Sequence, residues 1–265
     1  FVLYFHNDPL SIAGSDSSAG AGIQVDLRMF SALGTYGTTA ITALTAQNPA
    51  EVTAVVGMEA DFVKAQIETV AKGMPLSALK TGMLWSADVI QVVADFLRDN
   101  PNIPGVVDPV MIATSGAKLV ADEAIKIYKT QLLPRAALMT PNIDEAQVLL
   151  DGATIEAGNQ EEAARELSKR YRCPVLLKGG HLEGDPVDLL FEKGEVYRWT
   201  QARLENVNTH GSGCMLSAAI TSYLAHGKSL REAVEKGLKT IHKVLANPVE
   251  PADGLVLAGV ESLRA

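Results

Sequence analysis

The sequence is short of cysteine, of positive charge and of long apolar runs, and each shortage excludes a class of protein. Its 265 residues include two cysteines, Cys173 and Cys214, which cannot form a disulfide framework or a four-thiolate zinc site. The net charge of −8 argues against a broad surface for nucleic acids or anionic membranes. No uninterrupted apolar run reaches about 18 residues, so the sequence predicts no membrane span. A reducing cytoplasm is the simplest compartment.

The first nine residues lack the features of a signal peptide. Residues 1–5 are apolar, but the run is too short and has no basic leader, and residues 6–9 form a turn-like break. We interpret residues 1–9 as either an expression remnant or an irregular N-terminus. The hydrophobic content of 47% suits a globular protein, and the length suits one large α/β domain over residues 10–265.

Short apolar runs alternate with longer amphipathic segments over most of the chain. Strands are predicted at residues 10–13, 38–44, 77–82, 105–109, 137–142 and 174–180, with a hairpin at 187–191 and 195–200. Helices are predicted at residues 22–33, 61–72, 87–98, 121–133, 160–171, 214–225 and 230–245. This alternation is typical of βαβ units and predicts a three-layer α/β/α fold with a central, mainly parallel sheet.

Residues 208–214, Asn-Thr-His-Gly-Ser-Gly-Cys, run directly into a helix of small residues. The first amides of a helix have no internal partner and carry partial positive charge, and glycines let such amides crowd around an anion. A phosphate is the usual occupant. Cys214 would lie in the first helical turn, where its pKa should fall. An ordinary loop with an N-capping serine and a buried cysteine explains the same residues equally well.

Polar or glycine-containing segments follow almost every predicted strand. In α/β sheets of this kind, ligands bind beyond the carboxyl ends of the strands. Each segment alone is most simply a turn, but their convergence on one edge predicts a ligand site. The segments are residues 14–16, 80–82, 108–109, 140–142, 178–180 and 211–213.

Several of these residues suit phosphate or metal binding. Asn142 and Glu145 form a capping-box pattern, and the alternative is that they organise Mg²⁺ through waters. Asp108 would be a second acidic member, or else a turn acceptor before Pro109. Lys178 ends an apolar strand and could bridge the phosphates of ATP.

The N-terminal glycine-rich loop, residues 14–22, matches neither a nucleotide P-loop nor a dinucleotide-binding fingerprint. It leads into a helix that carries Asp26. This carboxylate could bind a small polar ligand through hydrogen bonds, although a solvated helix charge is the default interpretation.

Taken together, these motifs resemble the hydroxymethylpyrimidine/phosphomethylpyrimidine kinases of thiamine biosynthesis, within the ribokinase superfamily. The matching blocks occur in family order at residues 12–18, 22–24, 41–48, 80–84, 107–111, 113–116, 140–142, 178–181 and 208–214. The resemblance implies a ribokinase-like fold. It also implies ATP-dependent phosphorylation of 4-amino-5-hydroxymethyl-2-methylpyrimidine, and then of its monophosphate to the diphosphate.

The resemblance also implies roles for the residues around the phosphates. The anion hole for the transferred γ-phosphoryl group would consist of Gly211, Ser212 and Gly213. Cys214 would replace the aspartate base of many ribokinase relatives and accept the proton of the substrate hydroxymethyl group. ATP and its phosphates would contact Lys178, Asn142 and Thr209, and Mg²⁺ would be held by Asp108 and Glu145.

The implied pyrimidine pocket lies at the other end of the site. It would be lined by Gly14, Asp26, Gln47, Met83 and Val110, and residues 111–118 would form a flap that closes over the substrate. Ala19 departs from the family pattern, which usually has glycine there. A homodimer is implied, and a monovalent-cation requirement is left open.

Two other functions compete with this one. A pyridoxal kinase of vitamin B6 salvage would use the same glycine–cysteine ending, but some of those enzymes carry a flap cysteine that residues 113–115, Ala-Thr-Ser, lack. A non-catalytic binding protein of the same fold would have no need of a base at Cys214.

Overall fold

The computed structural model describes residues 8–111, 121–180, 185–205 and 207–263. Its centre is a nine-stranded sheet of order β3-β2-β1-β4-β5-β6-β7-β8-β9, in which β2, β1 and β4 to β7 run parallel and the other three strands are antiparallel to their neighbours. The strands are β1 (Asp8–Ser15), β2 (Thr38–Gln47), β3 (Val52–Gly57), β4 (Leu76–Thr81), β5 (Gly105–Val107), β6 (Leu138–Met139), β7 (Val175–Leu177), β8 (Val187–Glu192) and β9 (Glu195–Thr200). A separate small hairpin pairs β10 (Val249–Ala252) with β11 (Leu255–Leu257).

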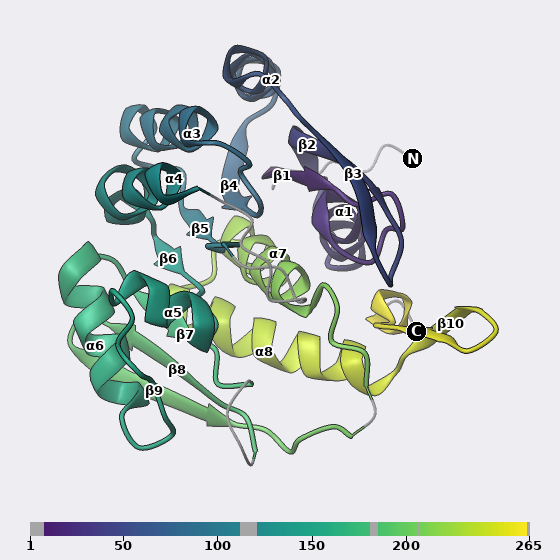
Figure 1. Cartoon of the computed structure of the whole chain (residues 1–265), viewed down its shortest axis with the longest axis vertical. Coiled ribbons are helices and arrows are strands. Elements are labelled where there is room, and N and C mark those ends of the chain that lie inside the picture. Colours follow the sequence, from purple (N-terminus) through teal and green to yellow (C-terminus); the bar gives the residue numbers. More distant parts are fainter. Residues whose placement is uncertain (1–7, 112–120, 181–184, 206, 264–265) are drawn as a thin grey trace.

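Helices cover both faces of the sheet, which confirms the predicted three-layer α/β/α fold (Figure 1). One layer contains α2 (Ala60–Gly73), α3 (Ala87–Asp99), α4 (Asp122–Ile127), α5 (Ile143–Leu149) and α6 (Gln160–Tyr171). The other contains α1 (Gly22–Ala32), α7 (Ser212–Ala225) and α8 (Leu230–Ala246). Neighbouring strand residues alternate between the two cores: Val107 packs in the first and Val106 in the second. The central strands are therefore apolar on both faces.

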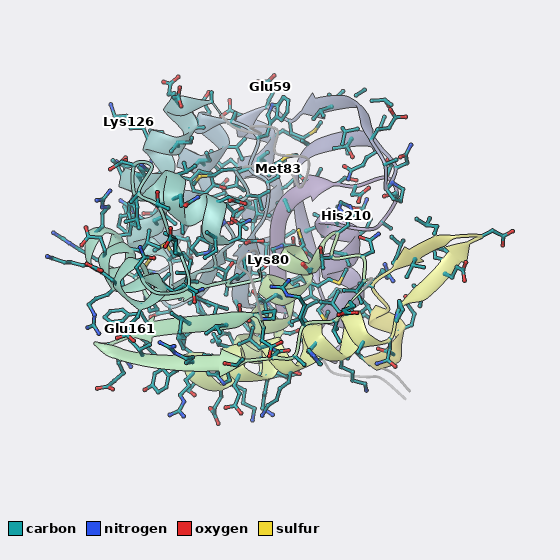
Figure 2. All side chains as sticks on the ribbon, turned by 60° about the horizontal axis from the view of Figure 1, so that its bottom comes forward. Glu59, Lys80, Met83, Lys126, Glu161 and His210 are labelled. Atoms are coloured by element: carbon teal, nitrogen blue, oxygen red, sulfur yellow. The ribbon has the colours of Figure 1, made fainter. Side chains whose placement is uncertain are left out.

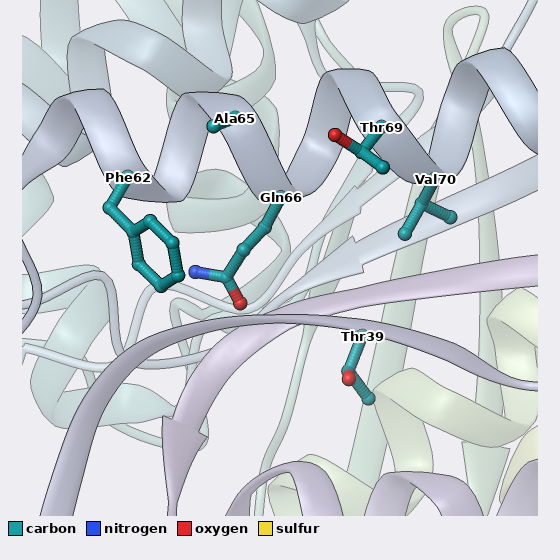
Figure 3. A pocket seen from close by; sticks show the side chains of 6 residues that line it. All are labelled: Thr39, Phe62, Ala65, Gln66, Thr69 and Val70. Carbon is teal, nitrogen blue, oxygen red and sulfur yellow. The ribbon is translucent and has the colours of Figure 1, made fainter.

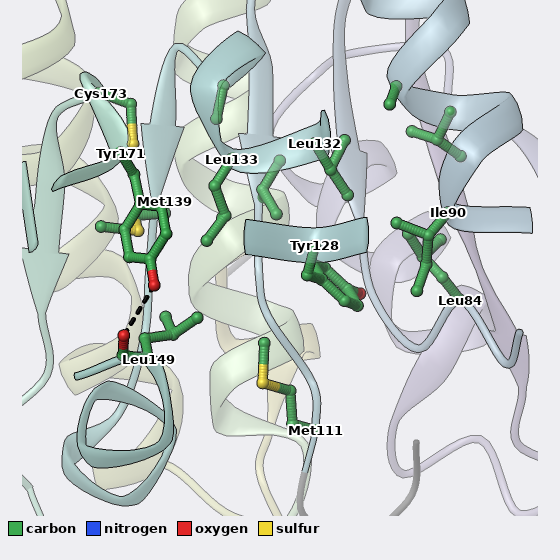
Figure 4. Packing of buried hydrophobic residues seen from close by; sticks show 14 of the residues in the cluster. Leu84, Ile90, Met111, Tyr128, Leu132, Leu133, Met139, Leu149, Tyr171 and Cys173 are labelled. Carbon is green, nitrogen blue, oxygen red and sulfur yellow. Dashed lines mark hydrogen bonds between the residues drawn. The ribbon is translucent and has the colours of Figure 1, made fainter. Parts of the chain in front are cut away.

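The predicted helix at 121–133 is wrong in its second half. The α-helix stops at Ile127, a π-helical turn spans Tyr128–Leu132, and a 3₁₀ turn spans Leu133–Arg135. Pro134 has no amide hydrogen to continue an α-helix. The altered winding turns Tyr128, Leu132 and Leu133 into the core, where Figure 4 shows them among other buried apolar side chains, with Leu133 toward Met139. In the same core, the hydroxyl of Tyr171 donates a 2.7 Å hydrogen bond to the carbonyl oxygen of Leu149.

Strand β3 was not predicted, because its residues are almost all exposed and show no buried face. It covers only the second half of β2. At the uncovered half, the side-chain amide of Gln66 on α2 accepts from the amide of Ile41 (2.9 Å) and donates to its carbonyl oxygen (3.0 Å). Figure 3 shows Gln66 reaching from the helix toward the strand, within an open pocket of about 320 Å³. The helix thereby protects part of a sheet edge that would otherwise present unpaired backbone groups.

The domain begins earlier than predicted. Asp8 and Pro9 belong to β1 and are buried, so they are part of the domain, while residues 1–7 lie outside the described ranges. Pro9 stands near the start of the strand, where a proline is tolerated, and its carbonyl oxygen accepts from Thr38. The other predicted elements are confirmed. Strands β5, β6 and β7 are shorter than expected, and beyond β6 and β7 the pairing continues as an isolated bridge between Asn142 and Lys178. Among the described residues, no helix is long and apolar enough to cross a membrane.

Candidate active site

The predicted convergence at the carboxyl ends of the strands is present. Lys178, after β7, donates from Nζ to Oδ1 of Asp108, after β5, at 3.1 Å. The hydroxyl of Thr140, after β6, donates to the same oxygen at 3.0 Å. A Cβ added at Gly213 would lie 3.3 Å from Nζ of Lys178 and 3.5 Å from Oδ2 of Asp108. The first turn of α7 therefore faces a lysine from the end of β7 and a carboxylate from the end of β5.

The capping-box interpretation of Asn142 and Glu145 is confirmed. Asn142 Oδ1 accepts from the amide of Glu145 at 2.8 Å, and Glu145 Oε2 accepts from the amide of Asn142 at 2.9 Å. Glu145 is also buried. Burial raises the pKa of its carboxyl to about 7, with Lys178 opposing the rise and Asp108 adding to it. Glu145 thus caps the helix with one oxygen and belongs to the same charge cluster as Asp108.

Asp108 and Glu145 provide the one or two carboxylates with which proteins usually bind a magnesium ion. Neither carboxylate is more than 3% exposed, and Nζ of Lys178 lies 3.1 Å from Oδ1 of Asp108. Among the residues that the structure describes, no group of three or more His, Cys, Asp or Glu side chains could hold a metal by itself. Mg²⁺ usually binds one or two carboxylates and completes its shell with water and substrate phosphates. The donor set suits an ion that arrives with a nucleotide.

Residues 208–213, here called the anion loop, end in a helix start that has no side-chain cap. Gly211 occupies the N-cap with φ +75°, and the amide of Ser212 donates to the carbonyl oxygen of Thr209 at 3.0 Å. Ser212 is already the first residue of α7, so the alternative in which it caps the helix is wrong. The side chain of Thr209 is exposed. The N-terminus of α7 keeps its partial positive charge for an external anion.

The expectation of a lowered pKa at Cys214 is wrong. Burial raises the pKa of the thiol to about 11, while Lys80 lowers it and the charges of Asp26 and Asp108 raise it. Loss of hydration disfavours the thiolate more than the helix start and one lysine favour it. In the free protein Cys214 is a neutral thiol.

The residues assigned to the pyrimidine pocket lie around the glycine-rich loop, residues 14–22, here called the acceptor loop. Gly14 packs against Met83, since an added Cβ would lie 2.7 Å from the Met83 methyl carbon. Gln47 is tied to the loop through Ser17, whose hydroxyl lies 2.8 Å from both its amide and its carbonyl oxygen. Val110 is half-buried and follows Asp108. The structure thus brings Gly14 and Met83 together, and it attaches Gln47 to the same loop at Ser17.

Asp26 is not a solvated helix charge. It is fully buried, accepts from the hydroxyl of Ser11 at 2.6 Å, and pairs with Nζ of Lys80 at 3.0 Å. Burial raises the pKa of Asp26, and Lys80 opposes the rise. Both carboxylate oxygens already have a partner, so direct contact with a substrate stays a prediction.

Three residues of the site were given no role by the sequence: Lys80, Asp16 and His210. Figure 2 shows Lys80 and His210 with Met83 toward the middle of the molecule, and Glu59, Lys126 and Glu161 toward its outside. Lys80 lies within β4, and a lysine in an apolar strand is a sequence signal that could have identified it. The same kind of signal, a lysine at the end of an apolar strand, did identify Lys178. The flap at 111–118, apart from Met111, and His181 lie outside the described residues.

Comparison with known proteins shows the family to which the chain is similar. The family model described as phosphomethylpyrimidine kinase matches residues 16–257. A hydroxymethylpyrimidine/phosphomethylpyrimidine kinase of Rhizobium meliloti is 45% identical, over 89% of this chain and 90% of its own length. A thiamine biosynthesis bifunctional protein of Geobacter sulfurreducens is 43% identical over 93% of this chain, which spans about half (51%) of that relative. The ADP complex of Bacillus subtilis pyridoxal kinase superposes with a TM-score of 0.90 at 30% identity, covering 98% of this chain and 99% of that one.

Proposed function

Because the chain belongs to the phosphomethylpyrimidine kinase family, we propose that it transfers the γ-phosphoryl group of ATP to 4-amino-5-hydroxymethyl-2-methylpyrimidine. The same site then phosphorylates the monophosphate to the diphosphate. The observation that carries this proposal is the meeting of Lys178, Asp108 and Gly213 at an uncapped helix start. A lysine and free helix amides beside a buried carboxylate are what phosphoryl transfer from a metal-bound nucleotide needs.

The anion loop supplies most of the stabilisation in this mechanism. Amides of the anion loop bind the oxygens of the transferred group, chiefly those of Gly211 and Gly213, because the amide of Ser212 also donates to the carbonyl oxygen of Thr209. Lys178 neutralises charge on the phosphates. Asn142 and Thr209 contact the nucleotide at the edge of the site. Fixed amides and a held lysine need no reorganisation as charge develops, so positioning and electrostatics account for the acceleration.

Cys214 accepts the proton of the attacking hydroxymethyl group. Its raised pKa of about 11 means that the free protein holds a neutral thiol, which must release its proton to solvent before the resulting thiolate can accept the hydroxymethyl proton. Lys80 is the charge that favours the thiolate, since it lowers the pKa of Cys214. Proton transfer of this kind suits a loose transition state, in which the attacking oxygen needs little activation until late.

Mg²⁺ would be held by Asp108 and Glu145, and it would supply positive charge to the phosphate oxygens. In its absence the two carboxylates and Lys178 already form one charge cluster, in which Lys178 lowers the pKa of Glu145. The proton on Glu145 must leave before this carboxylate binds a cation.

The acceptor would lie between the acceptor loop and Met83. The Met83 methyl group packs directly on Gly14, where a side chain would clash, and Gln47, together with the Asp26 region, offers polar groups to an aminopyrimidine. A second candidate function is pyridoxal phosphorylation, which the likeness to a pyridoxal kinase at a TM-score of 0.90 favours. The higher identity to pyrimidine kinases favours the pyrimidine.

The test is ADP release with three separate acceptors: the hydroxymethylpyrimidine, its monophosphate and pyridoxal. Turnover on both pyrimidines, with pyridoxal much slower, is expected. Dominant turnover of pyridoxal would assign the chain to vitamin B6 salvage. Cys214→Ala should abolish turnover yet still bind ligands, whereas Cys173→Ala, at a buried cysteine outside the site, is the matched control. Near wild-type turnover of Cys214→Ala would refute the base assignment.

We also propose that the enzyme is a homodimer of the cytoplasm. Support for the dimer comes from exposed apolar side chains on β2, β3 and α2, among them Leu44, Val56 and Phe62, the last two 60% exposed. Val56→Lys should shift the mass measured by light scattering to that of a monomer. An unchanged mass would place the interface elsewhere. Two free cysteines are in keeping with a reducing compartment.

A further inference from the structure

Asp16 is the most heavily bonded carboxylate of the acceptor loop. Its Oδ1 accepts from the amide and the hydroxyl of Ser18, at 2.8 and 2.7 Å, and its Oδ2 accepts from the amide of Ala21 at 2.8 Å. The side chain is 4% exposed. Burial acts to raise the pKa of Asp16, but the contact with His210 and the hydrogen bonds from Ser18 and Ala21 hold it below its usual range. Asp16 is therefore an ionised group that fixes the shape of the loop.

His210 brings the anion loop to this carboxylate. Its Nε2 lies 3.6 Å from Oδ2 of Asp16, which is longer than a hydrogen bond. The same nitrogen is buried and has no other hydrogen-bond partner within the described part of the chain. The backbone of His210 is held separately, because its amide donates to the side chain of Asn208 at 2.9 Å. A buried ring nitrogen thus faces a buried carboxylate, and their separation exceeds a hydrogen-bond distance by a few tenths of an ångström.

Glycines let the two loops approach this closely. A Cβ on Gly20 would lie 2.9 Å from Cδ2 of the His210 ring, and a Cβ on Gly211 would lie 2.0 Å from the carbonyl oxygen of Gly20. Both contacts would clash. The acceptor loop and the anion loop are therefore packed backbone against backbone around the Asp16–His210 contact.

We propose that Asp16 and His210 are positioning residues that couple the two halves of the active site. Resting on the proposed function, the inference is that the 3.6 Å contact shortens to a charge-assisted hydrogen bond when a nucleotide phosphate binds the anion loop. Hydrogen bonds of active sites are often long before ligands bind and tighten in the complex. The tightened contact fixes the acceptor loop, so that the phosphate donor prepares the acceptor site. By linkage, the acceptor improves binding of the nucleotide by the same factor.

The decisive experiment compares His210→Leu, which keeps bulk but loses the donor, with His210→Gln, whose amide can replace Nε2. Hydrogen exchange of residues 14–22 is followed by mass spectrometry with and without a non-hydrolysable ATP analogue. In the wild type and in His210→Gln, the analogue should slow exchange of the acceptor loop several-fold. In His210→Leu it should have no effect there. His226→Leu is the matched control, because that histidine bonds to Leu33 at the far end of α7.

Kinetics give a second measure. Saturating ATP should lower the KM of the acceptor about tenfold in the wild type, the size expected for one charge-assisted hydrogen bond. The ratio of the acceptor KM at low ATP to that at saturating ATP should fall below about twofold in His210→Leu and return to about tenfold in His210→Gln. A purely structural role would lower the melting temperature without changing this ratio.

Every outcome decides the inference. Wild-type coupling in a folded His210→Leu variant would overturn it. If that variant does not fold, Gly20→Ala keeps both side chains and pushes the ring from Asp16, and retained coupling there would equally overturn it. If no acceptor is phosphorylated by the wild type, the proposed function fails, while the exchange experiment, which needs only the nucleotide analogue, still decides the coupling.

Discussion

Replacing Lys80 by Met should destabilise the protein far more than replacing an exposed lysine that makes a similar ion pair. Lys80 Nζ lies 3.0 Å from Oδ1 of Asp26, and neither side chain has any exposed surface. Removing one partner leaves a buried, uncompensated carboxylate that keeps the hydrogen bond from the hydroxyl of Ser11. The loss should be about 3–5 kcal/mol in the free energy of unfolding. For a chain of this length, that corresponds to a fall in Tm of about 6–20 °C.

Urea unfolding monitored by circular dichroism is the assay, and Lys239→Met is the matched control. Lys239 pairs with Glu235 at 2.6 Å, but the two side chains are 72% and 38% exposed, so no measurable change is expected. The double variant Asp26→Asn/Lys80→Met should recover most of the loss, because no buried charge remains.

The stability of the single variant should depend on pH. Burial already raises the pKa of Asp26, and without Lys80 it rises further. The folded state then binds a proton that the unfolded state lacks above about pH 4, so stability falls as pH rises. A loss below about 1 kcal/mol that does not vary with pH would refute the reasoning on the buried pair.

Three further predictions concern single residues. Ala19 has φ +60°, so Ala19→Gly should raise the free energy of unfolding by about 0.5–1 kcal/mol. Ala21→Gly, at φ −144°, should lower it, and equal changes in the urea midpoints of the two variants would contradict this. Gln66→Leu should cost about 1–3 kcal/mol by leaving the backbone groups of Ile41 unpaired, and an unchanged urea midpoint would show that water replaces the amide. Iodoacetamide should alkylate Cys214 at pH 8 about a hundredfold more slowly than a thiol of pKa 9, with the rate rising tenfold per pH unit; a plateau below pH 9 would show that the thiolate is stabilised.

The three-layer fold and the position of the site at one sheet edge could both be predicted from the sequence, because both follow from the apolar runs that mark covered parallel strands. Runs such as Val106–Val107 and Leu176–Leu177 are apolar on both faces, which only a covered parallel strand requires. Once the strands are parallel, their carboxyl ends share an edge, and Asp108, Asn142 and Lys178 must gather there.

What the sequence could not supply depends on burial between distant elements. Cys214 stands at a helix start, but its pKa follows from how far the surrounding elements exclude water. The pairing of Asp26 with Lys80 joins α1 to β4, and neither residue has a local pattern that names the other. Strand β3 has no buried face, so no periodicity marks it, and only its pairing with β2 defines it.

The order in which the chain is synthesised has a consequence for when this site can exist. Helix α7, which carries the anion loop, packs against α1 and β4, and the hydroxyls of Thr35 and Ser222 meet at 2.8 Å across 187 positions of sequence. On the ribosome, the N-terminal strands can pair long before α7 has emerged, because domains begin to fold from the N-terminal side during translation. Closing so long a loop is slow, so in refolding the recovery of activity should lag behind the recovery of secondary structure. A chain released before α7 would contain all nine strands of the central sheet and no helix start to bind the phosphate.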